Sequence, residues 1–459
     1  MLWWGMRLAT LLFAGVALAA ALLPAPLRAA AAAPRPALVE MAPVPEAASG
    51  SAGRLDVSAA THAYLAEVSG PARVRSDAYF EGGYWLLLWD FLWGAGVSLL
   101  LLASGWSAAM RDRAERWTRR AFLRGALYSL QYLVATAVLS LPLAFYEGFV
   151  REHSYGLSNL GLGGWFGEWG KGLAVTVVLL TPALALFYRI VARAPRTWWL
   201  WGAASVAVLL VFAVLIAPVV LVPIFNDPKP LRDERVAVPI LSMARANGIA
   251  TGQVWEIDAS RQSNRISANV SGFLGTQRIT LNDNLLARAS LPEIEAVMGH
   301  EIGHYAMNHG IALVLEYGLV AAAGLALVSA LFERVRRRSG ARWRVRGVDD
   351  PAGLPLLALL FSGVMLIATP VTNTIFRTEE QAADWYGLNA ARQPDAFARA
   401  TLKVSEYRKL EPGWLEEILF YDHPSGRTRI ETAMRWKAEH PETWETAGGH
   451  TAPPAAPGR

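Results

Sequence analysis

The chain contains no cysteine and little charge. Of its 459 residues, 18% are charged and 53% are hydrophobic, and the mean hydropathy is +0.27. Without cysteine there are neither disulfide bonds nor thiolate ligands for a metal, and such a composition is compatible with an oxidising compartment. A balance this apolar excludes an ordinary soluble protein. The composition therefore points to a membrane protein.

Six apolar segments are long enough to cross a bilayer, because a spanning helix needs about 20 apolar residues. They are Tyr84–Trp106, Phe122–Val150, Gly172–Val191, Trp198–Ile224, Ile311–Phe332 and Leu354–Ile375. Buried helices of a large soluble protein are the alternative, but apolar runs of this length are rare outside membranes. The sequence therefore predicts an integral membrane protein in a lipid bilayer.

Both ends of the chain differ from these segments. The apolar run Leu8–Leu23 follows Arg7 and precedes Ala29–Ala33. A charged start, a short apolar core and small residues are typical of a secretory signal peptide, with a further membrane helix as the alternative. Residues 440–459 have no apolar periodicity, so we expect a disordered tail.

Arginine is concentrated in three short loops between the predicted spans, within 111–124, 189–196 and 334–346. Alternating spans place these loops on one side of the membrane, which the positive-inside rule makes cytoplasmic. Residues 226–309 and those after Phe376 then lie on the opposite face. The signal-like start suggests a bacterial inner membrane, with this face in the periplasm. Because the arginines flank membrane spans, we expect no nucleic acid partner.

Within the segment 226–309, the motif His300-Glu-Ile-Gly-His304 lies in a predicted helix, Leu291–His309. Residues four apart share a helix face, so the two imidazoles can bind one Zn²⁺. Glu301 can then act as general base on a water bound to that ion. The spacing predicts a metal-assisted hydrolase, most often a peptidase. A helix with two polar residues on one face is the alternative.

The residues before this helix predict a small β-sheet. We expect a helix over Leu231–Asn247 and strands over Gln253–Asp258, Arg265–Phe273 and Gln277–Leu281, and a capping box over Ser290–Glu293 that opens the metal-bearing helix. An edge strand beside such a helix can pair with the backbone of an extended peptide. We therefore expect a peptide or protein substrate.

A hydrolytic zinc site normally has three protein ligands and one open position. The position ten residues after His300, where metzincins have a third histidine, is Gly310. His309 is one residue short of it and on another face, so we interpret His309 as a cap or a neighbour of a ligand. The better candidate is Glu380, because Asp384 follows one helical turn later and could accept the free N–H of a ligating histidine.

At this point the chain resembles the type I CAAX prenyl endopeptidases, a family of integral-membrane zinc metalloproteases. The resemblance covers about residues 122–436. It is carried by His300–His304 with Asn308-His309, Arg377–Asp384, Asn269–Phe273 with Arg278–Leu281, His423-Pro424 with Arg429-Ile430, and Phe149–Leu157. The family's strand motif Asn-Ala-Tyr is replaced here by Asn269-Val270-Ser271, which leaves the substrate preference open.

The resemblance implies a ligand set of His300, His304 and Glu380 for one Zn²⁺ per chain, with Glu301 activating water. It chooses Glu380 over its neighbour Glu379, in agreement with the spacing to Asp384.

The resemblance also places other residues around the metal. Asn269 would lie on the substrate-binding strand, Arg429 would contact substrate, and His423 would stand near the site and steady the oxyanion. The implied fold is mainly α, a polytopic ring of six or seven membrane helices around a hydrated chamber, capped by a thermolysin-like domain with a small β-sheet.

The predicted organisation has seven parts. They are a signal peptide or first membrane helix (1–33), an extracytoplasmic linker (34–83), membrane helices (84–224), a metallopeptidase segment (225–310), two further membrane helices with a basic loop (311–376), a segment with the third ligand and the His-Pro motif (377–439), and the tail (440–459).

We therefore expect a zinc-dependent endopeptidase that processes or degrades membrane or envelope proteins. One alternative is an intramembrane site-2-type protease, but no Asp occurs within Leu354–Ile375 to serve as its third ligand. Another is a zinc-stabilised membrane scaffold, which would not need Glu301. A transporter would place ionisable groups inside spans. Asp90 and Glu147 are the candidates, but both lie near span ends or within aromatic belts, and Glu316, the most interior carboxylate, has no assigned role. The sequence does not indicate an oligomeric state.

Overall fold

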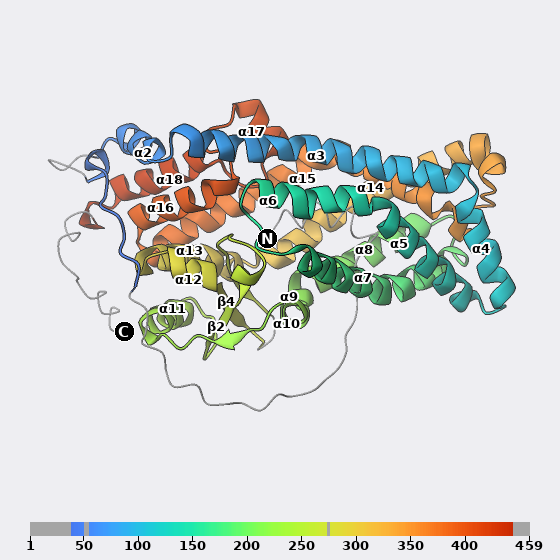
Figure 1. Ribbon diagram of the computed structural model, residues 1–459, viewed down its shortest axis with the longest axis horizontal. Helices are drawn as coiled ribbons and strands as arrows, with labels where there is room; N and C mark the ends of the chain where they lie inside the picture. Colours follow the sequence, from blue (N-terminus) through green and yellow to red (C-terminus); the bar gives the residue numbers. More distant parts are fainter. Residues whose placement is uncertain (1–37, 50–54, 273–275, 444–459) are drawn as a thin grey trace.

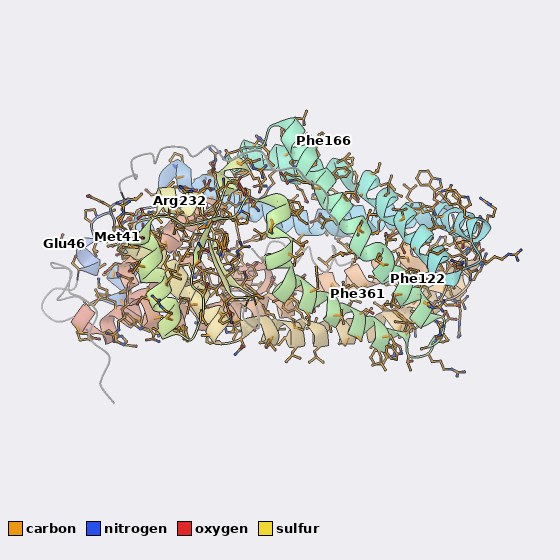
Figure 2. All side chains as sticks on the ribbon, turned by 90° about the horizontal axis from the view of Figure 1, so that it is seen from below. Met41, Glu46, Phe122, Phe166, Arg232 and Phe361 are labelled. Carbon is orange, nitrogen blue, oxygen red and sulfur yellow. The ribbon has the colours of Figure 1, made fainter. Side chains whose placement is uncertain are left out.

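The computed structural model describes residues 38–49, 55–272 and 276–443. Long helices run along the molecule, and a small sheet with shorter helices lies toward one end (Figure 1). Met41 and Arg232 mark that end, and Phe122 and Phe361 lie toward the opposite one (Figure 2). The predicted signal segment (1–33) and nearly all of the predicted tail lie outside the described residues.

Within the described part, five helices are long and apolar enough to cross a membrane. They are α3 (Gly70–Ala103), the continuous helix Ala121–Ser154 that comprises α5 (Ala121–Phe145), a π-helical turn and α6 (Glu152–Ser154), α7 (Leu162–Val191), α14 (His309–Trp343) and α15 (Leu354–Ala391). Helix α5 packs against α7, and α15 packs against both α3 and α14. The mainly helical, membrane-spanning fold class is thereby confirmed.

The predicted span over 198–224 is wrong as a single helix. It forms α8 (Trp198–Val211), a π-helical turn, α9 (Ala217–Val220) and α10 (Val222–Phe225). The apolar helix that it contains, Trp198–Val214, is shorter than the five candidate spans. Proline at positions 218 and 223 lacks the backbone N–H that a continuous helix needs, so the apolar run is interrupted where hydropathy alone predicts continuity.

The three arginine-rich loops meet at one end of the helix bundle. In the first loop, α4 (Trp106–Trp117) carries Arg111, whose Nη1 lies 2.6 Å from Asp350 Oδ2 in the third loop; both side chains are buried. Trp198, which follows the second loop, belongs to the same apolar cluster as Val345 of the third. The expectation that these loops share one side is consistent with this packing.

Helix α15 carries the chain from this basic end toward the sheet. From Leu354 to Glu380 the helix rises through 26 residue steps, roughly 40 Å at 1.5 Å per step. This distance exceeds the hydrocarbon thickness of a bilayer, about 30 Å. Along α15, Glu380 therefore lies farther from the basic end than the thickness of the hydrocarbon.

The expected linker (34–83) is helical over much of its described part. Helix α2 (Val57–Ala66) packs against α18 (Gly426–Glu439) and α16 (Pro394–Val404), and α3 begins already at Gly70. Tyr64 is fully buried in the core shared by these helices. The linker interpretation is corrected here, because residues of α2 pack into a core with α16 and α18, which lie more than 300 residues later in the chain.

The sheet has four strands in the order β1-β2-β4-β3 and is mixed. Strand β1 (Lys229–Pro230) is antiparallel to β2 (Val254–Ile257), β2 is parallel to β4 (Arg278–Asn282), and β3 (Ala268–Ser271) is antiparallel to β4. The core beneath it joins buried residues of the sheet with those of α11 (Glu234–Ala246), α12 (Asp283–Arg288) and α13 (Leu291–Ala306). Strand β3 is thus an edge strand, and it packs against α13.

The buried pair at the basic end yields a stability prediction. Asp350 also accepts hydrogen bonds from the backbone N–H groups of Arg346 and Ala352. The substitution Asp350→Ala therefore removes these two hydrogen bonds and leaves the buried Arg111 without its carboxylate partner. We expect a loss of about 3–5 kcal/mol, seen as a lower melting temperature in detergent. The control is Glu115→Ala, whose pair with Arg346 is much more exposed and contributes about 1 kcal/mol or less. Equal losses in both variants would contradict the prediction.

Candidate active site

Two helices approach each other closely at the site. A Cβ added at Gly387 of α15 would lie 2.6 Å from the backbone N of His300, and one at Gly299 of α13 would lie 2.8 Å from the carbonyl oxygen of Gly387. One turn further along, a Cβ at Gly303 would lie 3.0 Å from the Cβ of Tyr386. Each histidine of the motif therefore follows a glycine that lets its backbone pack against α15.

The start of α13 is fixed by buried polar contacts. The Ser290 N–H donates to Glu293 Oε2 at 2.6 Å, forming the predicted capping box, and Lys403 Nζ donates to the same oxygen at 2.7 Å. Glu293 is almost fully buried. Val39 pairs with Ser290 in an isolated parallel bridge. The orientation of α13 is thus determined from three separate parts of the chain.

This packing brings three potential metal ligands together. His300 Nε2 lies 3.3 Å from Glu380 Oε2, His304 Nε2 lies 3.3 Å from Glu380 Oε1, and the two Nε2 atoms are 3.1 Å apart. His300 and Glu380 are buried, and His304 is partly buried. All three ligand atoms lie within 4.8 Å of one another, an arrangement that can hold a metal ion.

The remaining ring nitrogens of the two histidines are also engaged. His300 Nδ1 lies 2.7 Å from Asp384 Oδ1, which is the carboxylate partner that the spacing in α15 suggests. His304 Nδ1 lies 2.9 Å from Nδ1 of His309. The predicted helix Leu291–His309 ends at Ala306, and Asn308 adopts φ 58°, which starts α14 at His309. This turn points the ring of His309 back at His304.

Arg429, for which a substrate contact is expected, contacts Asp384 and His300. Its Nε donates to Asp384 Oδ2 at 2.8 Å, its Nη2 donates to Oδ1 of the same carboxylate, and Nη2 lies 3.3 Å from His300 Nδ1. The side chain is only 13% exposed. The bidentate pair holds Asp384 in place, and it leaves little of the guanidinium for a substrate.

Two further predicted residues lie at the site or beside it. His423 Nε2 is 3.3 Å from Glu380 Oε2, and its Nδ1 is 2.8 Å from Asp422 Oδ1. Asn269 is buried on the edge strand β3, opposite Thr280 of β4. The strand packs against α13, so a peptide added to its free edge would lie along the helix that carries both histidines.

Burial and neighbouring groups shift the pKa values of three residues at the site. Burial alone would lower the pKa of His300, but hydrogen bonds to Asp384 and Glu380 outweigh it and raise the pKa to about 9. Burial raises the pKa of Glu301 above its usual range, as is useful for a group that takes up a proton. Burial and the nearby Arg408 lower the pKa of His423.

Sequence reasoning missed the residues that shape this site indirectly. Gly299 and Gly303 stand four apart in a helix interior, where each costs about 1 kcal/mol relative to alanine; that cost is a signal of close packing. No comparable sequence signal marked Lys403 or Arg408, whose Nη2 lies 3.3 Å from His423 Nε2. Their positions depend on how α16 and the following loop pack against α13.

The site consists of two histidines and a glutamate, largely buried and carried by helices at one end of a membrane bundle. This arrangement defines the class of membrane-embedded metallohydrolases. Comparison with known proteins agrees. Residues 230–437 match peptidase family M48, and residues 67–227 match the family described as the CAAX prenyl protease N-terminal region with five membrane helices.

Two relatives and one solved structure extend the comparison. The metalloprotease YhfN of Bacillus subtilis is 30% identical over 354 residues, which are 75% of this chain and 83% of the relative. CAAX prenyl protease 1 of Saccharomyces cerevisiae is 28% identical over 335 residues, 69% and 72% of the two chains. The crystal structure of S. mikatae Ste24p superposes with a TM-score of 0.66 at 24% identity, covering 80% of this chain and 89% of that one.

The chain belongs to peptidase family M48 and to its CAAX prenyl protease branch. It is an integral membrane metalloprotease, and its substrates are peptides or proteins. The resemblance drawn from the motifs, the fold class and the prediction of an enzyme are confirmed.

The glycine contact at the site can be tested directly. Gly387→Ala places a methyl group against the backbone of His300, so α13 and α15 must separate, at a cost of about 1–3 kcal/mol. We expect a lower melting temperature together with a reduced metal content and peptidase activity. The control is Gly318→Ala in α14, where the added Cβ meets nothing within 4 Å. A Gly387→Ala protein with full metal content and activity would refute the proposed packing constraint.

Proposed function

We propose that His300, His304 and Glu380 bind one Zn²⁺. Two imidazoles and a carboxylate are a usual ligand set for a hydrolytic zinc site, with the fourth position open. Ligands about 2.0–2.1 Å from a tetrahedral zinc are separated from one another by about 3.3 Å. The separations of 3.1, 3.3 and 3.3 Å between the donor atoms support this assignment and carry the proposal.

Glu301 is the proposed general base of peptide hydrolysis. A zinc held by these three residues would polarise the scissile carbonyl and lower the pKa of a water toward about 7. Glu301 takes the proton of the attacking water and passes it to the leaving amine. Its position directly after His300, and a pKa raised by burial, suit both transfers.

The surrounding residues hold this arrangement. Asp384 orients His300 through Nδ1, and Arg429 fixes Asp384 by a bidentate pair. His309 contacts His304 in the same way. His423 steadies the oxyanion, and Asn269 lies on the strand that pairs with the substrate backbone. This assignment rests on the distances around the three ligands and on the place of β3 at the sheet edge.

We further propose that the enzyme resides in a bacterial inner membrane with its site on the periplasmic face. The meeting of the basic loops at one end and the roughly 40 Å that α15 covers before Glu380 support this orientation. Its substrates would then be misfolded or mistargeted membrane and envelope proteins rather than prenylated CAAX proteins. A site-2-type mechanism is disfavoured, since α13 is not among the candidate spans.

The role of Glu301 predicts a separation of metal binding from catalysis. Glu301→Gln keeps the size of the side chain but cannot accept a proton, so we expect an unchanged zinc content and a loss of activity of at least about 100-fold. The measurements are metal content by mass spectrometry and cleavage of casein or a reporter peptide by the detergent-purified protein. Retained turnover would remove Glu301 from this role.

The ligand assignment predicts different outcomes for two adjacent glutamates. Glu380→Ala removes one of three ligands, so we expect a large loss of zinc content at fixed free zinc. Glu379→Gln is the control, because this residue is also buried in α15 but is outside the group of donors, and we expect it to retain zinc. If only the control variant lost zinc, Glu379 and not Glu380 would be the third ligand.

A further inference from the structure

Helix α17 (Trp414–Phe420) presents its apolar side outward. Trp414, Leu415 and Ile418 are 76%, 51% and 42% exposed, respectively. Positions three and four apart share a helix face, so these three side chains form one apolar surface. A helix of a soluble surface has the opposite arrangement, with its charges in water and its apolar face buried.

The charged residues of α17 are turned into the protein. Glu416 Oε1 accepts hydrogen bonds from Tyr84 Oη at 2.7 Å and from Lys409 Nζ at 2.9 Å. Glu417 Oε1 accepts the backbone N–H of Ser425 at 2.8 Å. The outward face of α17 is therefore left without charge, and water is a poor solvent for it.

Two spanning helices fix the height of α17 along the bundle. The ring of Phe420 stacks on Tyr84 of α3 with a centroid distance of 4.2 Å. From α15, Asn373 Nδ2 donates to the carbonyl of Leu419 at 2.9 Å, and Arg377 Nη1 donates to that of Tyr421 at 2.6 Å. The apolar runs of the sequence begin at residue 84 in α3 and end at residue 375 in α15, so both helices place α17 at a boundary of the hydrocarbon.

The surface of α3 continues from this point into the membrane. Trp85 and Trp89 are 65% and 53% exposed, and Leu92 on the same stripe is 45% exposed. Exposed tryptophans at the end of a span are typical of the membrane–water interface. Figure 1 shows α17 beside α3 on the outside of the bundle. The apolar face of α17 therefore lies next to a surface that faces lipid.

We propose that α17 is an interfacial anchor whose face of Trp414, Leu415 and Ile418 inserts into the headgroup–acyl boundary on the active-site side of the bilayer. The partner is the lipid surface, because continuity with the stripe on α3 favours lipid over a second copy of the chain. Such insertion reaches about 5–10 Å into the boundary. His423 follows the end of α17 by three residues, so the anchor holds the depth of the site relative to the membrane.

The absence of cysteine makes the test direct. Single cysteines at Leu415 and Ile418, each with a nitroxide spin label, are placed in the full-length protein in lipid nanodiscs. Collision rates with oxygen, which concentrates in acyl chains, and with a water-soluble nickel chelate report the depth of each label. The aqueous control is Val238→Cys in α11, where an apolar side chain is 55% exposed on the sheet domain. The acyl control is Leu92→Cys.

We expect the oxygen-to-nickel ratio at Leu415 and Ile418 to be several-fold higher than at Val238 and lower than at Leu92. A ratio equal to that at Val238 would overturn the anchor. Protection from both reagents would also overturn it, because the face would then be covered by protein, such as a second copy. Trp414→Cys replaces any label variant whose melting temperature falls. The experiment requires neither zinc nor activity, so it is independent of the proposed function.

Discussion

The close contact between α13 and α15 is the constraint on which the rest of the site depends. The proposed ligands of one metal ion come from two helices, and only glycine at 299, 303 and 387 lets the backbones of these helices approach far enough. The glycines at this contact contribute no ligand or catalytic group. The contact sets the separation between His300 and Glu380, and a change of one ångström there would separate the donor atoms beyond the reach of a single ion.

Polar contacts convert this steric constraint into a fixed geometry. The Asp384–Arg429 pair ties α18 to α15 and to His300, and the Glu293–Lys403 pair ties α16 to the start of α13. Each pair is largely buried and joins segments distant in sequence. A metal site built in this way is preorganised, since the ligands do not need to rearrange when the ion binds.

Local sequence patterns were sufficient to predict much of the structure. The features that were not predicted depend mostly on packing between distant parts of the chain. Five of the six apolar runs overlap the candidate membrane spans, which are formed by α3, α5 with α6, α7, α14 and α15, because hydropathy over about 20 residues is a strong signal. The spacing of His300 and His304 and the capping box at Ser290 were equally local. The packing of α2 and the engagement of Arg429 with Asp384 depend on neighbours far along the chain, which periodicity does not encode. The break near residue 218 has a local cause, the two prolines, which hydropathy does not register.

The core that α2 shares with α16 and α18 has a consequence for biosynthesis. Tyr64 donates to Asp395, 331 residues later, and Lys437 donates to the carbonyl of Ala48. Because a chain emerges from the ribosome in sequence order, the N-terminal partners wait while every membrane helix is inserted. Arg429, which holds Asp384 against His300, is likewise among the last described residues to be made. The protease is therefore assembled only after insertion is complete. A chain that stalls or is truncated before Arg429 would carry helix α13 with both histidines but would lack the contacts that hold the site together.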